Sequence, residues 1–158
     1  MKAKKFKSAE ANNRKKQITV SYTSGKRISI HYSSLGITEN IKRVWIDSET
    51  RGQSVGMEYE NGKTDYMPYD QPLAIAKDSE FVLQNQIENL IAQIKEAIHA
   101  KKISKRYLAE QLHTSDNQIQ RLLNPAILNK NLEQLYRIGS LLNLDLELSA
   151  KPSDEAAA

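Results

Sequence analysis

A short polar run in the C-terminal half carries the side chains best suited to specific binding. Residues 115–124 read Ser-Asp-Asn-Gln-Ile-Gln-Arg-Leu-Leu-Asn. If Ile119 and Leu122 face inward from a helix, most of the side chains left outward are Asn, Gln or Arg. Such side chains form paired hydrogen bonds with the edges of adenine and guanine in the major groove of DNA. The candidate base-reading residues are Asp116, Asn117, Gln118, Gln120 and Arg121.

Asp116 and Arg121 each have a second role that the sequence leaves open. Asp116 could cap the N-terminus of its helix instead of accepting a hydrogen bond from cytosine. Arg121 could pair with Glu110 or with a phosphate instead of guanine. For Asn117 we favour base reading.

A second short helix must position this run. The spacing of apolar residues predicts two helices, 104–112 and 115–123, separated by a turn at His113-Thr114. The inward side chains of the first helix would be Leu108, Ala109 and Leu112. Ala109 is small, which suits the close approach of two helices that cross steeply.

These residues resemble the helix-turn-helix of the lambda-repressor-like family, also called the xenobiotic-response-element family. The matching positions are Leu108-Ala109, Leu112, Thr114-Ser115, Ile119, Leu122 and Asn124. Residues 131–144 are similar to the closing helix of that family and the turn after it. The resemblance covers about residues 84–150 and implies a DNA-binding domain.

The resemblance also implies roles for two groups of residues. The base-contacting positions of the family correspond here to Asp116, Asn117 and Arg121. Its phosphate-contacting positions correspond to Ser104, Lys105 and Asn124. Together with the adjacent Arg106 and Ser115, the candidate phosphate contacts are Ser104, Lys105, Arg106, Ser115 and Asn124.

Two positions depart from the family pattern. His113 stands where the turn usually has Gly, and His tolerates the left-handed conformation better than most residues do. Lys105 stands where the family usually has Gln, so attraction for phosphate is kept while the directional amide is lost.

The N-terminal half shows the alternation of β-strands. Apolar Ile18, Val20 and Tyr22 alternate with polar residues, and the same pattern recurs after a turn at residues 23–26. Asn61-Gly62 is typical of a tight hairpin turn. We therefore expect a small, mostly antiparallel sheet of about four or five strands over residues 17–68, with Trp45 in its core.

Helical periodicity follows the sheet region. The apolar stripe consists of Leu83, Ile87, Leu90, Ile91, Ile94 and Ile98. Asp78 or Ser79 is placed to cap this helix, which would pack against the later helices or form a dimer seam. Residues 144–148 alternate Leu with acidic residues, which indicates a short closing strand.

The predicted fold class is α+β, a small N-terminal antiparallel sheet followed by an all-α helix-turn-helix domain of about four to five helices. We expect a basic flexible leader over 1–16, a β-rich domain over 17–75, a helix-turn-helix domain over 78–150 and a disordered tail over 151–158. The leader has a net charge of +6 within a chain total of +4. It would lie along phosphates or simply aid solubility.

Several function classes find little support in the sequence. The chain has no Cys, no apolar run long enough for a membrane span and no signal-peptide pattern, which favours the cytoplasm and the nucleoid. Its three His residues lie in different elements, and no Walker, nucleophile-elbow or dinucleotide-binding pattern occurs. A ribonuclease using His31 and Arg27 is disfavoured, because His31 is expected on a solvated strand face. We expect no enzyme, no cofactor and no metal site.

The sequence therefore predicts a transcriptional regulator, a repressor that binds a pseudo-palindromic operator in double-stranded DNA as a homodimer. The rival interpretation is the antitoxin of a type II toxin–antitoxin pair, which neutralises its toxin and represses its own operon. An RNA-binding or scaffold adaptor is the third. The β-rich domain could dimerise the chain, bind a ligand or hold a toxin, and sheet-edge pairing is our preferred dimer contact.

Overall fold

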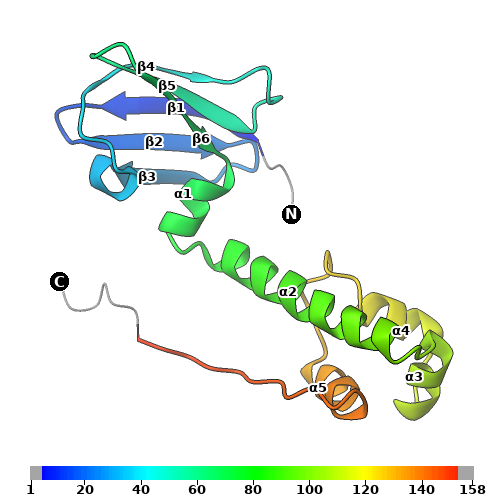
Figure 1. Cartoon of the computed structure of the whole chain (residues 1–158). Coiled ribbons are helices and arrows are strands. Elements are labelled where there is room, and N and C mark those ends of the chain that lie inside the picture. The colour runs from blue at the N-terminus through cyan, green and yellow to red at the C-terminus, as the bar shows by residue number, and fades with distance from the viewer. Residues whose placement is uncertain (1–4, 153–158) are drawn as a thin grey trace. The chain divides into compact units, whose positions relative to one another are not determined.

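The computed structural model describes residues 5–152, and within them the predicted α+β class is confirmed (Figure 1). The strands are β1 Phe6–Asn12, β2 Gln17–Tyr22, β3 Arg27–His31, β4 Ile41–Ile46, β5 Ser54–Tyr59 and β6 Thr64–Pro68. The helices are η1 Tyr32–Leu35, α1 Asp70–Ile75, α2 Ser79–Ala100, α3 Lys105–Gln111, α4 Asp116–Leu122 and α5 Leu132–Leu141. The chain divides between Leu83 and Gln84 into two compact units, the sheet unit and the helical unit. No helix in residues 5–152 is long and apolar enough to cross a membrane.

The sheet unit contains two three-stranded antiparallel sheets, in the orders β1-β2-β3 and β4-β5-β6. Their apolar faces enclose one core, in which Ile18, Val20 and Val55 are fully buried. Asn13 joins the sheets, because its side chain accepts from the Ile41 N–H and donates to the Ile41 carbonyl, each at 2.9 Å. The expectation of one sheet of four or five strands is corrected to six strands in two sheets.

The prediction of a flexible leader is wrong for Phe6–Asn12, because this segment forms β1 and pairs with β2. Phe6 is buried and stacks on Tyr22 at 4.9 Å between ring centroids. A bulge between Phe6 and Ser8 interrupts the alternation, and only small Ala9 and Ala11 follow on the core side. The period-two signal is therefore weak in the sequence. Residues 1–4 of the predicted leader lie outside the described residues.

Trp45 is not in the sheet core, contrary to expectation. It lies partly exposed on the outer face of β4, opposite Gly56 of β5, while Val44 and Ile46 point to the core. A Cβ on Gly56 would overlap the Trp45 indole, so the ring lies directly over the glycine. Tyr66 meets this ring edge-on at 6.1 Å. Strand alternation therefore outweighed the general tendency of Trp to be buried.

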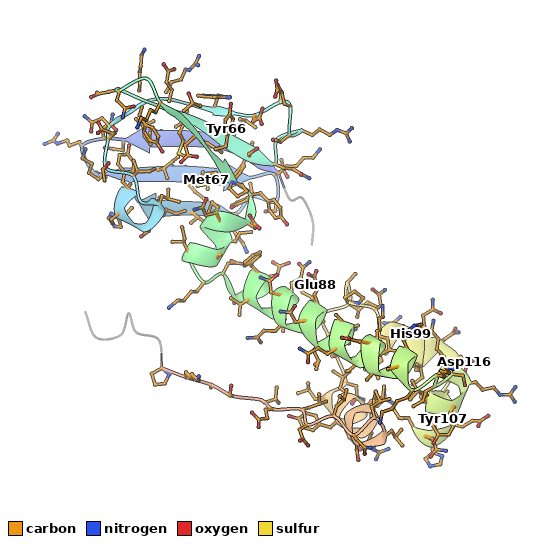
Figure 2. All side chains as sticks on the ribbon, viewed as in Figure 1. Tyr66, Met67, Glu88, His99, Tyr107 and Asp116 are labelled. Carbon is orange, nitrogen blue, oxygen red and sulfur yellow. The ribbon has the colours of Figure 1, made fainter. Side chains whose placement is uncertain are left out.

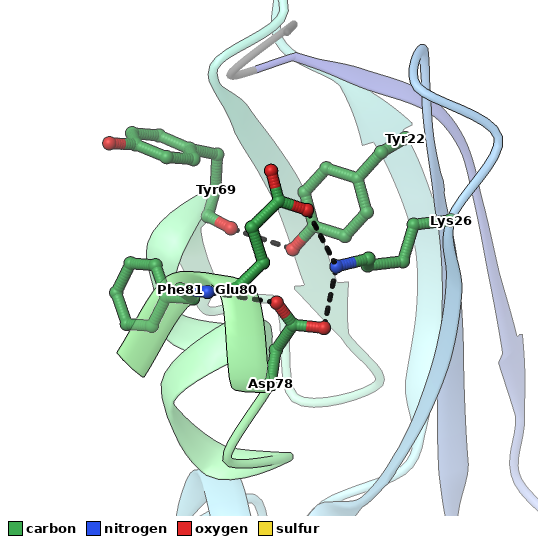
Figure 3. Close-up of polar contacts among 6 residues, drawn as sticks. All are labelled: Tyr22, Lys26, Tyr69, Asp78, Glu80 and Phe81. Carbon is green, nitrogen blue, oxygen red and sulfur yellow. Dashed lines mark hydrogen bonds and ion pairs between the residues drawn. The ribbon is translucent and has the colours of Figure 1, made fainter. Parts of the chain in front are cut away.

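The end of the sheet unit fixes the beginning of α2 (Figure 3). Asp78 Oδ1 accepts the Phe81 N–H at 3.0 Å, which confirms Asp78 as the predicted cap. Its second oxygen accepts from Lys26 Nζ at 2.5 Å, and this hydrogen bond lowers the pKa of Asp78. Beside it, the Tyr22 hydroxyl donates to the Tyr69 carbonyl at 2.6 Å, and burial raises the pKa of Tyr22.

The helical unit has its own core, formed by α2 to α5. Ile91, Ile94 and Ile138 are at most 1% exposed, whereas Leu83 at the start of the predicted stripe is 42% exposed. The predicted closing strand at 144–148 is wrong, because these residues form no ladder within residues 5–152. Residues 153–158 of the predicted tail lie outside the described residues, and Lys151 and Pro152 have no regular structure.

Candidate nucleic-acid interface

The two short helices α3 and α4 begin and end within a residue or two of the prediction. Ser104 caps α3, its Oγ accepting the Tyr107 N–H at 3.1 Å. Ser115 caps α4 in the same way, its Oγ accepting the Gln118 N–H at 3.2 Å. Each hydroxyl therefore satisfies one of the helix-terminal N–H groups that lack an intrahelical partner. Both caps were expected to contact phosphate, and that expectation stays a prediction.

The turn between α3 and α4 uses a left-handed residue, as the substitution of His for Gly suggests. His113 has φ 51°. The Thr114 N–H donates to the Ala109 carbonyl at 2.9 Å, which closes the turn. Ala109 is 4% exposed beneath it, while Leu108 and Ile119 are fully buried between the helices. The predicted inward residues of both helices are therefore confirmed.

All five candidate base-reading residues are exposed on α4. Asn117 and Arg121 are one turn apart, so both lie along the side of α4 opposite Ile119. Gln118 and Gln120 lie on the two flanks of this face, each lining a different groove. Asp116 occupies the first turn of α4 (Figure 2). The central pair Asn117 and Arg121 is therefore exposed at the middle of this face.

The structure bears on two alternatives that the sequence leaves open, the Glu110 pair of Arg121 and the cap role of Asp116. Glu110 pairs with Arg106 at 3.2 Å, one turn away on α3, and Arg121 has no ion pair within residues 5–152. Asp116 does not cap α4, because Ser115 holds that position. Arg106 is partnered, but both members of its pair are well exposed, so the ion pair competes only weakly with a phosphate.

A basic groove runs beside the exposed face of α4. It has a volume of about 770 Å³ and lies between the end of α2, the start of α3 and the end of α4. Its polar lining comprises Lys95, His99, Lys102, Ser104, Lys105, Gln120 and Asn124, and none of its lining residues is acidic. His99 and Tyr107 are seen at this end of the unit in Figure 2. The groove gathers three of the predicted phosphate contacts, Ser104, Lys105 and Asn124.

The sequence reasoning missed the contribution of α2 to this groove. Lys95, His99 and Lys102 recur at four- and three-residue spacing, which places them along one side of the helix and its end. That spacing was visible in the sequence.

Lys130 is a second residue that sequence reasoning missed. Its Nζ donates to the main-chain carbonyls of Arg121 at 3.0 Å and Asn124 at 2.6 Å, so an ammonium group caps the C-terminal end of α4. Burial, and then the nearby Lys95, lower the pKa of Lys130. The Oδ1 of Asn124 accepts the Ala126 N–H at 3.0 Å, so a phosphate contact by Asn124 would come from its NH2 group.

Comparison of the chain with protein-family models, with curated proteins and with solved structures found no match. Within residues 5–152, no group of three or more His, Asp or Glu side chains is placed to hold a metal ion. His31 is exposed and contacts Gln17 across the strand pair at 3.2 Å. The exposed face of α4 and the adjacent basic groove form the candidate functional site.

Proposed function

We propose that this chain is a sequence-specific DNA-binding regulator whose helix α4 enters the major groove of double-stranded DNA. The observation that carries the proposal is the juxtaposition of an exposed Asn and Arg face with a groove that has cationic and no acidic lining. The major groove is wide enough to admit a helix, and its base edges match amide and guanidinium groups. Asn117 would pair with adenine and Arg121 with guanine.

The basic groove would hold the phosphate backbone that flanks the contacted bases. Lys95, Lys102 and Lys105 supply positive charge there, and the Ser104 hydroxyl and the Asn124 amide supply directional donors. Phosphate contacts of this kind fix the register of a protein on DNA without reading sequence. The exposed face of α4 would therefore provide specificity, and the basic groove would provide affinity.

The expected functional unit is a homodimer on a pseudo-palindromic operator. One recognition helix reads only a few base pairs, which is too little for useful specificity in a genome. Two copies whose α4 helices enter successive major grooves would read two half-sites about 34–36 Å apart. Occupation of such an operator would block transcription sterically, which makes repression the expected outcome.

Selection from a pool of random duplex DNA tests the proposal. We expect the full chain to enrich an inverted repeat, with half-sites separated by about one helical turn. The selected duplex should also outcompete a single-stranded RNA of equal length. A folded chain that enriches no duplex sequence would contradict the proposal, and preference for the RNA would favour an RNA-binding adaptor instead.

A further inference from the structure

The segment that follows α5 has the pattern of a β-strand but no strand beside it. From residue 144 to 152 the sequence reads Leu-Asp-Leu-Glu-Leu-Ser-Ala-Lys-Pro, in strict alternation of apolar or small residues with polar ones. Figure 1 draws it as an extended ribbon without an arrow. No backbone hydrogen bond joins residues 145–152 to another part of residues 5–152. Residues 145–152 therefore present a row of main-chain groups without a backbone partner in residues 5–152, which is a template for another strand.

One face of this segment is only half covered by its own helical unit. Leu144 and Leu146 pack against the core, and Leu146 lies directly on Gly139 of α5. Leu148 is next on the same face, and it is 72% exposed. The apolar face therefore continues beyond the surface that the chain itself provides.

A groove lies alongside the segment. It has a volume of about 470 Å³ and is lined by Tyr136 and Ser140 of α5 and by residues 144–147. Leu132 precedes Tyr136 by one helical turn, and these two side chains are 48% and 41% exposed. An extended chain laid beside the segment would therefore find apolar surface under it.

We propose that the occupant is a second copy of this chain, whose residues 144–152 pair antiparallel with the same residues of the first. This inference rests on the proposed function for its two-fold symmetry, and it names the dimer contact that operator binding requires. It replaces the sheet edge that the sequence alone favoured. A pair of identical segments about a two-fold axis is self-complementary by construction.

Charge selects the register of this pair. With Leu148 opposite Leu148 of the partner subunit, Asp145 lies opposite Lys151 of the partner subunit, and Glu147 lies opposite Ser149 of the partner subunit. Moving the axis to Leu146 would set Asp145 against Glu147 of the partner subunit, and moving it to Glu147 would set two Glu side chains against each other. Like charges directly opposite are destabilising in a sheet.

The hydrogen-bonding pattern is compatible with this register. The Leu144 N–H already donates to the Gly139 carbonyl at 2.8 Å, and Pro152 has no N–H to donate. In the proposed register Leu144 lies opposite Pro152 of the partner subunit. Because neither residue has a free N–H to donate, this position suits a pair that exchanges no hydrogen bonds. Such pairs recur at every second position of an antiparallel ladder, which makes the Leu148 pair another of them, with Cα atoms about 4.5 Å apart.

Disulfide trapping in the full chain tests the proposal directly, because the sequence contains no Cys. Leu148→Cys on the axis should form a covalent dimer under mild oxidation, since the expected Cα separation suits a disulfide. Ala150→Cys is the matched control. It lies on the same face, but its two copies would be about 13 Å apart, beyond the reach of a disulfide. We expect at least about tenfold faster cross-linking at position 148.

Charge reversal provides a second test that leaves Leu148 in place. Lys151→Glu should raise the dimer dissociation constant by on the order of tenfold, because two opposite-charge pairs become like-charge pairs. Adding Asp145→Lys to the same chain should restore it, because the pairs are then reversed. Sedimentation without DNA measures both variants, so failure here is distinct from failure to select an operator. A monomeric chain, equal cross-linking at 148 and 150, or no rescue by the double variant would overturn the proposal.

Discussion

Both units contain ion-paired cationic side chains, but in the helical unit a group of lysines without ion pairs within residues 5–152 lines a groove beside α4. In the sheet unit, Lys26 pairs with Asp78, and Lys42 and Arg43 both pair with Glu58. In the helical unit, the lysines of the basic groove and Arg121 have no ion pair within residues 5–152. Ion-paired charges are neutralised by their neighbours in the fold, whereas the unpaired charges gathered beside α4 remain available to a polyanion.

The two units also differ in how polar side chains on their surfaces are used. Across β2 and β3, Thr19 bonds to Ser29 at 2.8 Å, and Gln17 contacts His31 at 3.2 Å. On α4, the amides and the guanidinium of the central face have no such side-chain partner within residues 5–152. Residue type alone therefore does not mark a binding face. The informative feature is a polar side chain whose hydrogen-bonding capacity the fold leaves unused.

The largest expected effect separates the stabilities of the two units. Leu108→Ala should destabilise the helical unit by about 3 kcal/mol, because the fully buried side chain leaves a cavity between α3 and α4. Thermal unfolding followed by circular dichroism at 222 nm reports mainly the helices, and fluorescence of the single Trp45 reports the sheet unit. We expect the helical transition to move to lower temperature by more than the Trp45 transition. Equal shifts would show that the two units unfold as one.

The next effect concerns the exposed face of α4. Asn117→Ala and Arg121→Ala should each lose about 1–3 kcal/mol of discrimination between a selected operator and a duplex altered at one base pair. Asn89→Ala on α2 and Arg137→Ala on α5 are matched controls, because both residues are exposed and lie outside α4. Fluorescence anisotropy with the two duplexes measures the difference. Unchanged discrimination in natively folded variants would remove base reading from these residues.

A smaller effect tests the ion pair between Lys26 and Asp78 in the sheet unit. Asp78→Asn keeps a capping side chain but removes the charge that faces Lys26, so it should cost about 1 kcal/mol of stability near neutral pH. Lys26 lowers the pKa of Asp78 below its ordinary value of 3.8 in the folded chain. The contribution of Asp78 to the free energy of unfolding is therefore fully present above pH 3.8, and it is lost as the pH falls through the lowered pKa. Denaturant titrations from pH 7 to pH 2 should show the two proteins converging in acid.

The smallest effect sharpens the role of the basic groove. Lys95→Gln and Lys102→Gln should each weaken binding to all duplexes alike and lower the slope of log affinity against log salt by about 0.9. Lys63→Gln, in the exposed turn between β5 and β6, is the control and should leave the slope unchanged. If both groove variants have the same salt slope as the unsubstituted chain, α2 does not contact the phosphates.

Local patterns in the sequence were enough to place α3 and α4. The left-handed turn at His113 follows from the resemblance to a family that usually has Gly there, whereas the bounds of α3 and α4 and their inward residues follow from residue spacing within about twenty residues. The same holds for the hairpins of the sheet unit and for the Asp78 cap of α2. Caps, turns and periodicities are formed by neighbours in the chain, so the sequence carries them directly.

Contacts between distant residues decided the rest. Whether Phe6–Asn12 becomes a strand depends on β2 and on the core behind it, and the position of Trp45 depends on which side of β4 faces that core. Lys130 reaches the end of α4 only because the loop after α4 folds back. The alternation after α5 is plain in the sequence, but pairing needs a partner strand, and residues 5–152 contain none beside it. Period and residue type determine what a segment can form, whereas tertiary structure determines whether its partner is present.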